Sequence, residues 1–321
     1  MINMNKENGD AAPAQNVRLV FMGTPAFAVA SLDALVQEGF EIAGVITAPD
    51  KPAGRGLQLQ QSAVKTYALE NGLRILQPEK LKNPAFIQEL KSLNADLQIV
   101  VAFRMLPEVV WNMPPLGTID VHGSLLPQYR GAAPINWAII NGEKETGVTT
   151  FKLQHEIDTG AILLHEKITI GENETAGELH DRMKNVGAQV LVKTILDLKN
   201  GSLHAIPQPN IQTALKHAPK IDTETCRIDW NKSVYDIYNL IRGLSPYPAA
   251  FTTLEEKKLK VFTVEKQTTS PTEPPGTFVT DKKNVLKFAC LDGYIIATDI
   301  QLEGKKRMSV AEFLRGYRFA S

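Results

Sequence analysis

The sequence contains only two cysteines, Cys226 and Cys290, in 321 residues. Two cysteines are too few for a disulfide framework, and their spacing fits no zinc-binding motif. Small folds stabilised by disulfides or by a structural metal are therefore excluded. We expect both residues to be buried or half-buried thiols, in a protein from a reducing compartment.

The chain also lacks an excess of charge and lacks long apolar runs. It carries 35 basic and 35 acidic residues, so any nucleic-acid partner must be held by local patches. No apolar run approaches the length of a membrane-spanning helix, and the polar residues 1–15 contain no signal-peptide core. We expect a cytoplasmic protein without membrane association, and a disordered tail over residues 1–15.

Strand-like and helix-like segments alternate in the first half of the chain. Segments typical of strands occur at 17–22, 41–46, 73–76, 97–103 and 117–122. Helical spacing of apolar residues separates most of them. This alternation predicts a doubly wound, mostly parallel α/β sheet of the Rossmann-like type. Such sheets bind ligands beyond the carboxyl ends of their strands.

The pattern changes in the second half. Paired strands are expected at 146–153 and 161–170, and one long helix is expected at 176–199. Short apolar runs then follow at 250–254, 258–264, 276–279, 285–289 and 294–297, which favours a small OB-like β-barrel. We therefore predict a catalytic domain at 16–204, a linker at 205–220 that is rich in Pro, Gln, Asn and His, and a barrel domain at 221–321.

The clearest sign of chemistry lies between Gly117 and Gly131. Asp120 and His122 are two residues apart on a predicted strand, so both side chains point to the same face. A Gly-Ser turn follows, which suits close approach of the backbone to a ligand. A further carboxylate, Asp158, lies in a loop before Gly160. An imidazole and a carboxylate at the ends of neighbouring elements are the groups that a proton-transfer site requires.

Six segments together resemble those of bacterial methionyl-tRNA formyltransferases. They are VFMGTP (20–25), PDKPAGRG (49–56), HGSLLPQYRG (122–131), ETGVT (145–149), DTG (158–160) and IRGLSPYP (241–248). The resemblance extends from about residue 17 to the C-terminus. The HGSLLP block is specific to formyltetrahydrofolate-dependent transferases in general, whereas the segments at 49–56 and 241–248 narrow the resemblance toward the tRNA enzymes.

The resemblance implies that 10-formyltetrahydrofolate donates a formyl group to the methionine amine of initiator Met-tRNA, in translation initiation and without a metal. His122 and Asp158 would then supply acid–base catalysis. The binding site for the folate co-substrate would be lined by Phe103, Arg104, Leu106, Ser124, Leu125, Leu126 and Pro127. Arg55 and Lys51 would contact the tRNA, and we expect a monomer.

Asp120 departs from this family pattern, because the family typically has asparagine two residues before the histidine. The asparagine amide is thought to donate a hydrogen bond to the formyl oxygen, whereas an ionised carboxylate only accepts. Three readings follow: a neighbouring carboxylate keeps Asp120 protonated, the chain is a variant or deamidated form of low activity, or the fold is shared while catalysis is impaired.

Other functions share part of these motifs. A formyltransferase acting on a small amine, such as an amino sugar or a nucleotide precursor, would carry the same HGSLLP block, as would a formyltetrahydrofolate hydrolase. The loop at 49–56 favours the tRNA enzyme over these. A catalytically weakened RNA-binding relative is the alternative that Asp120 makes plausible.

Overall fold

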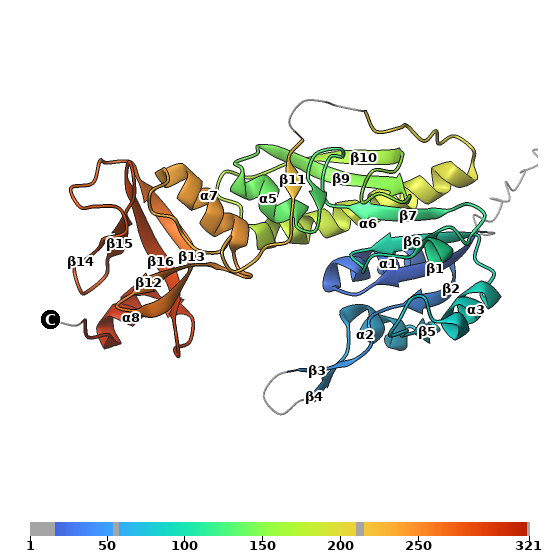
Figure 1. Ribbon diagram of the computed structural model, residues 1–321, viewed down its shortest axis with the longest axis horizontal. Helices are drawn as coiled ribbons and strands as arrows, with labels where there is room; N and C mark the ends of the chain where they lie inside the picture. The colour runs from blue at the N-terminus through green and yellow to red at the C-terminus, as the bar shows by residue number, and fades with distance from the viewer. Residues whose placement is uncertain (1–16, 54–57, 210–214, 320–321) are drawn as a thin grey trace, which may run out of the picture. The chain divides into compact units, whose positions relative to one another are not determined.

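The computed structural model describes residues 17–53, 58–209 and 215–319 (Figure 1). The chain forms two compact units. The first runs up to Val121 and includes Ala188–Ala205, and the second comprises His122–Gly187 and the chain from Ile206 onward. The expected tail at 1–15 lies outside the described residues. Among the described residues, no helix combines the length and the apolar character that crossing a bilayer requires.

The first unit is built on parallel strands, as the sequence predicts. Their order is β7-β6-β1-β2-β5, and each neighbouring pair is parallel. The strands are β1 (Arg18–Gly23), β2 (Glu41–Ile46), β5 (Ile75–Leu76), β6 (Leu97–Val101) and β7 (Thr118–His122). The connecting helices are α1 (Ala26–Gln37), α2 (Ala63–Glu70), α3 (Pro84–Ser92) and α4 (Glu108–Trp111). The doubly wound α/β fold is therefore confirmed.

Local sequence explains where these elements begin and which are central. The Ser62 hydroxyl caps α2 by accepting the Lys65 amide hydrogen, and the Asn83 side chain caps α3 immediately before Pro84, as helix N-termini prefer. Every residue of β6 is buried, which is typical of a parallel strand covered on both faces. The central strands thus hold the carboxyl-end loops on a rigid base.

One strand pair in this unit was not predicted. The residues at 48–56 were expected to form a loop, but β3 (Lys51–Ala53) pairs with β4 (Gln58–Gln60) as an antiparallel ribbon. Three-residue strands are too short to show a two-residue period, so the Pro and Gly residues dominated the prediction.

The second unit begins with a hairpin, helical segments and a short parallel strand pairing. The hairpin strands are β9 (Glu145–Lys152) and β10 (Ile162–Thr169), which pair antiparallel as predicted. Helix α5 (Pro134–Ile140) follows the turn after His122. The long helix α6 (Ala176–Lys199) belongs to this unit up to Gly187 and to the first unit from Ala188 onward. Strand β8 (Arg130–Gly131) pairs in parallel with β11 (His217–Ala218), so part of the expected linker forms a strand.

The same unit ends in an antiparallel sheet of six strands. Its order is β12-β13-β16-β15-β14, and β17 pairs with β16. The strands are β12 (Ala250–Leu254), β13 (Lys257–Gln267), β14 (Phe278–Thr280), β15 (Leu286–Ala289), β16 (Tyr294–Leu302) and β17 (Met308–Ser309). Within the described residues no pairing joins β12 to β14, so the predicted barrel domain is a half-barrel.

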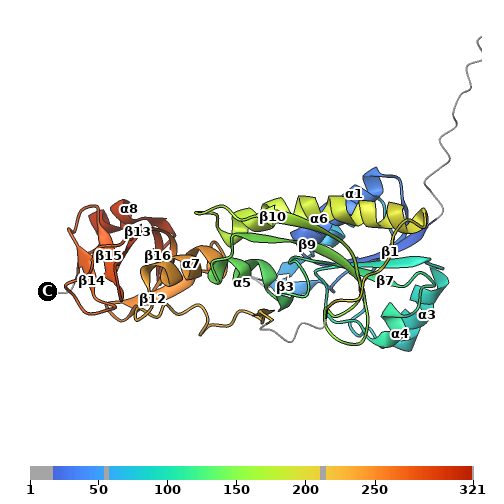
Figure 2. The same ribbon diagram turned by 90° about the horizontal axis from the view of Figure 1, so that it is seen from above.

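Two helices pack on this half-barrel. Helix α7 (Val234–Leu244) contacts β13, and α8 (Val310–Gly316) contacts β16 (Figures 1 and 2). In the core beneath them, Trp230 stacks on Phe288 with ring centroids 4.8 Å apart. Cys226 and Cys290 are both buried and free, which confirms the prediction of buried thiols.

Candidate active site

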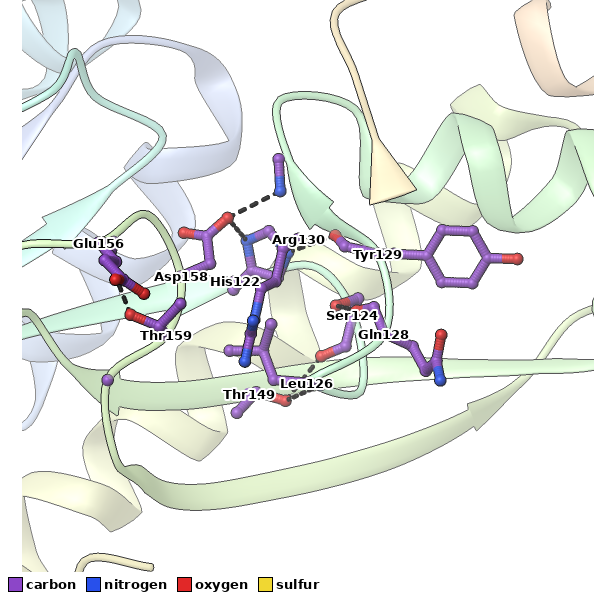
Figure 3. A network of polar contacts seen from close by, with 12 residues as sticks. His122, Ser124, Leu126, Gln128, Tyr129, Arg130, Thr149, Glu156, Asp158 and Thr159 are labelled. Atoms are coloured by element: carbon purple, nitrogen blue, oxygen red, sulfur yellow. Dashed lines mark hydrogen bonds and ion pairs between the residues drawn. The ribbon is translucent and has the colours of Figure 1, made fainter. Parts of the chain in front are cut away.

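His122 ends strand β7, and its ring is buried, with 8% of the residue exposed. Its Nε2 atom lies 2.9 Å from the carbonyl oxygen of Tyr129 (Figure 3). A carbonyl oxygen only accepts, so Nε2 carries the hydrogen in this contact. The edge of the ring meets Phe151 at a centroid distance of 6.5 Å. Nδ1 is therefore the ring nitrogen left to exchange a proton.

Asp158 faces that nitrogen. Its Oδ2 atom lies 3.8 Å from Nδ1 of His122 and accepts a 2.8 Å hydrogen bond from the amide of Gly131 (Figure 3). The 3.8 Å separation is longer than the donor–acceptor distance of a direct hydrogen bond. A carboxylate at this distance still stabilises an imidazolium by charge attraction. The two residues that the sequence proposed as an acid–base couple are thus brought together.

The segment from Tyr129 to Gly131 holds both members of this couple. The Tyr129 carbonyl orients the imidazole, and the Gly131 amide orients the carboxylate. Gly131 has a φ of +126°, and a Cβ there would lie 2.4 Å from the carbonyl oxygen of Ala218. Only glycine fits this position without displacing backbone. Sequence reasoning missed both contacts, because they are made by backbone atoms.

The turn after His122 is fixed by Thr149 on β9. The Thr149 hydroxyl donates to the Ser124 carbonyl at 2.6 Å and accepts from the Leu126 amide at 3.2 Å. The Ser124 hydroxyl donates to the Gln128 carbonyl at 2.6 Å, and Ser124 is fully buried. The hydrogen of this hydroxyl is therefore used within the turn.

The first unit contains a pocket of about 490 Å³. Its lining comes from Thr24, Ala48, Pro49, Asp50, Lys51, Glu79, Phe103 and Arg104. These residues follow the carboxyl ends of β1, β2, β5 and β6, where doubly wound sheets bind ligands. Three of the predicted binding residues, Lys51, Phe103 and Arg104, line it. Leu106 is not part of the lining, and Arg55 lies outside the described residues.

Charged groups on the wall of this pocket are held by specific partners. Lys65 Nζ lies 2.5 Å from Asp50 Oδ2, and Gln77 donates to Asp50 Oδ1 at 2.8 Å. The hydrogen bond from Lys65, followed by that from Gln77, holds the pKa of Asp50 below its ordinary value. Arg104 donates to the carbonyl oxygens of Pro78 and Glu79. Burial lowers the pKa of Arg104, although a guanidinium keeps its charge at neutral pH.

Two family models match this chain along most of its length. Residues 17–195 match the formyl transferase model, and residues 220–318 match the model of the formyl transferase C-terminal domain. The chain is 53% identical over 310 residues to the methionyl-tRNA formyltransferase of Bacteroides fragilis, covering 94% of this chain and 96% of that protein. The chain belongs to the methionyl-tRNA formyltransferase family. A second member, from Phocaeicola vulgatus, is 55% identical over 313 residues, which cover 95% and 97% of the two chains.

The fold is also shared with more distant solved structures. The N-formyltransferase from Helicobacter canadensis, in complex with folinic acid and dTDP-3-aminofucose, superposes with a TM-score of 0.66 at 22% identity. The superposition covers 88% of this chain and 98% of that chain. At this identity the likeness concerns the fold alone, and it supports the architecture of a methionyl-tRNA formyltransferase described above.

Asp120, which is expected from the sequence to differ from the family pattern, lies close to His122 in the chain. It lies on β7, where strand alternation gives it the same face as His122, and it is half-buried beside Val100 of β6 in the parallel register. Leu125 is half-buried, and Leu126 and Pro127 are buried. The predicted roles of these residues toward substrate stay predictions.

Proposed function

We propose that this chain transfers the formyl group of 10-formyltetrahydrofolate to the free amine of methionine on initiator Met-tRNA, giving formylmethionyl-tRNA for translation initiation. One observation carries the proposal: an identity of 53% over 310 residues, covering 94% of this chain, with a methionyl-tRNA formyltransferase. Both formyl transferase domains are matched as well. Chance similarity does not extend at this level through two domains.

The paired imidazole and carboxylate suit this reaction. Attack of an amine on a formamide carbon gives a tetrahedral intermediate with a negatively charged oxygen, so the reaction needs a base for the amine proton and a donor for the oxygen. Nδ1 of His122 accepts the proton in this proposal, because Nε2 is bound to a carbonyl. Asp158 stabilises the resulting imidazolium. The imidazolium would return the proton to the folate nitrogen as the bond between that nitrogen and the formyl carbon breaks. No covalent nucleophile is needed.

The remaining assignments belong to the same proposal. The folate would lie against Phe103, Arg104 and Leu106 and against the turn at 124–127, and the catalytic domain would span 16–204. The barrel domain at 221–321 would assist tRNA binding beyond the linker at 205–220. Arg55 and Lys51 would contact the acceptor stem. The protein would act as a cytoplasmic monomer.

The proposal is tested with purified protein, 10-formyltetrahydrofolate and initiator tRNA charged with methionine. Formylated Met-tRNA is expected, and the apparent affinity for tRNA should fall steeply as salt rises, because binding releases counterions from the phosphates. A folate-dependent rate on a small sugar amine, with no rate on Met-tRNA, would instead place the chain among the small-amine formyltransferases.

Asp120→Asn is expected to raise the rate of formyl transfer near neutral pH. An ionised carboxylate repels the developing oxyanion, whereas an asparagine amide donates to it. One oxyanion donor contributes about 100-fold or more to kcat in other enzymes, so we expect a gain of at least about tenfold. Asp197→Asn on α6 is the matched control. An unchanged or lower rate across the pH range would show that Asp120 is no defect and would favour its protonated form as the donor.

Arg55→Ala is expected to weaken the use of Met-tRNA more than the use of folate. Loss of one phosphate contact should raise the KM for Met-tRNA about fivefold to tenfold and reduce its salt dependence, with little change in the KM for folate. Arg74→Ala removes a surface pair with Glu89 and serves as the control. Equal effects on both substrates would argue that this loop does not contact tRNA.

A further inference from the structure

The side chain of Gln208, within the expected linker, is bound entirely to the two loops of the candidate active site. Its Nε2 donates to the carbonyl oxygens of Asp158 at 2.7 Å and Gly160 at 2.8 Å. Its Oε1 accepts two hydrogen bonds from the Arg130 guanidinium, one from Nε at 3.2 Å and one from Nη2 at 2.6 Å. Both amide hydrogens and both lone pairs are thereby used. No role of this residue follows from the motifs of the sequence.

The two loops joined by this amide are those that hold the acid–base couple. One carries the Asp158 carboxylate, which lies 3.8 Å from Nδ1 of His122. The other runs from Tyr129 to Gly131, and its backbone binds His122 Nε2 and Asp158 Oδ2. A shift of either loop would change the separation between the imidazole and the carboxylate. Gln208 is thus placed to set that separation.

Asp158 needs such support because of its backbone conformation. Its φ is +54°, in the left-handed region that residues other than glycine adopt infrequently. Strained residues persist where the surrounding contacts determine their conformation. One of the two hydrogen bonds donated by Gln208 goes to the carbonyl of this same residue, so the amide acts directly on the strained peptide.

Other parts of the linker also contact this region, but through backbone. The Tyr129 amide donates to the Lys216 carbonyl at 2.6 Å, and the Ala133 amide donates to the Ala218 carbonyl at 3.2 Å. Those contacts are made by main-chain carbonyl groups and do not depend on the chemistry of the side chains at 216 and 218. The contacts of Gln208 require a primary amide, since only that group offers two donors and an acceptor at one position.

We propose that Gln208 is a positioning residue for formyl transfer, which holds the Asp158 carboxylate at its working distance from His122. The inference rests on the proposed function. The side chain touches no reacting atom; it acts through the two loops. The linker between the catalytic and barrel domains is on this view a structural part of the catalytic site.

Two substitutions separate the donors from the acceptor. Gln208→Met has a similar length and removes all four hydrogen bonds, while Gln208→Glu keeps an acceptor for Arg130 and loses both donors. Each is expected to lower kcat about tenfold or more, because small misplacements of catalytic groups are costly. The KM values for folate and Met-tRNA should stay within about twofold. Gln37→Met, on α1 in the other unit, is the matched control and should leave kcat unchanged.

A double-variant cycle distinguishes positioning from general structural support. In an Asp158→Asn background, Gln208→Met should lower kcat by less than about twofold, since the carboxylate it positions is already absent. An equal loss in both backgrounds would overturn the proposal. So would a kcat for Gln208→Met within about twofold of the unmodified chain. If the methionine variant does not fold, the glutamate variant is tested by the same cycle and judged by the same limits.

The activity of the unmodified chain distinguishes failure of the proposed function from failure of the positioning role of Gln208. If that chain does not formylate Met-tRNA, the proposed function fails before any Gln208 variant is compared. If it is active and the Gln208 variants are equally active, the positioning role alone fails.

Discussion

His122→Ala is expected to lower the rate of formyl transfer about 100-fold or more, the usual effect of losing a positioned acid–base group. The ring is buried and fixed through Nε2, so Nδ1 faces Asp158 in a single orientation. Alanine removes the imidazole that accepts the amine proton in the proposed reaction. Single-turnover measurements with charged initiator tRNA would report this loss directly, because they separate the chemical step from product release.

The control for this experiment is His165→Ala, an exposed histidine on β10. It should retain the full rate. Folate binding by the His122 variant should also be preserved, since alanine removes no predicted folate contact. A loss smaller than about threefold would remove His122 from the mechanism.

Asp158→Asn is expected to lower kcat about 100-fold as well. The size of the loss depends on how strongly the carboxylate stabilises the imidazolium of His122. The asparagine oxygen can still accept the hydrogen bond from the Gly131 amide. The loop should therefore keep its conformation while the negative charge disappears. The measurement is kcat with saturating folate and Met-tRNA, and the melting temperature should be close to that of the unmodified chain.

The relation between the two substitutions is itself informative. Residues that act as one unit are strongly non-additive, so the double variant should be little slower than His122→Ala alone. Multiplicative losses would mean that Asp158 acts on something other than the imidazole. Retention of more than about a third of kcat by Asp158→Asn would show that the carboxylate is not needed for the proton transfer.

The spacing of apolar residues along the chain predicts most of the fold. Strand β6 lies within the largely apolar segment 97–103, and α6 coincides with the helix expected at 176–199, so both were predicted within a few residues. Helix α8 was missed although its signal was present. Ser309 and Glu312 form a capping box, and this S-x-x-E pattern before an apolar run can be read from sequence.

Short elements stabilised from elsewhere in the chain were not predictable in this way. Strands β8 and β11 have two residues each, and their partners are 87 residues apart in the register. A two-residue strand has no period. Its existence depends on the closure of a long loop, which local sequence does not encode.

The amino-acid sequence by itself determined the α/β sheet and the antiparallel β domain that follows, and it indicated His122 and Asp158 as candidate groups for proton transfer. These properties reside in side chains and in their spacing. The tertiary structure alone decided which ring nitrogen of His122 is available, which backbone groups hold the couple, and that Gln208 reaches both loops from the linker. The reason is physical: a carbonyl or an amide hydrogen is the same in nearly every residue, so its partner is chosen by the folded chain and not by residue type.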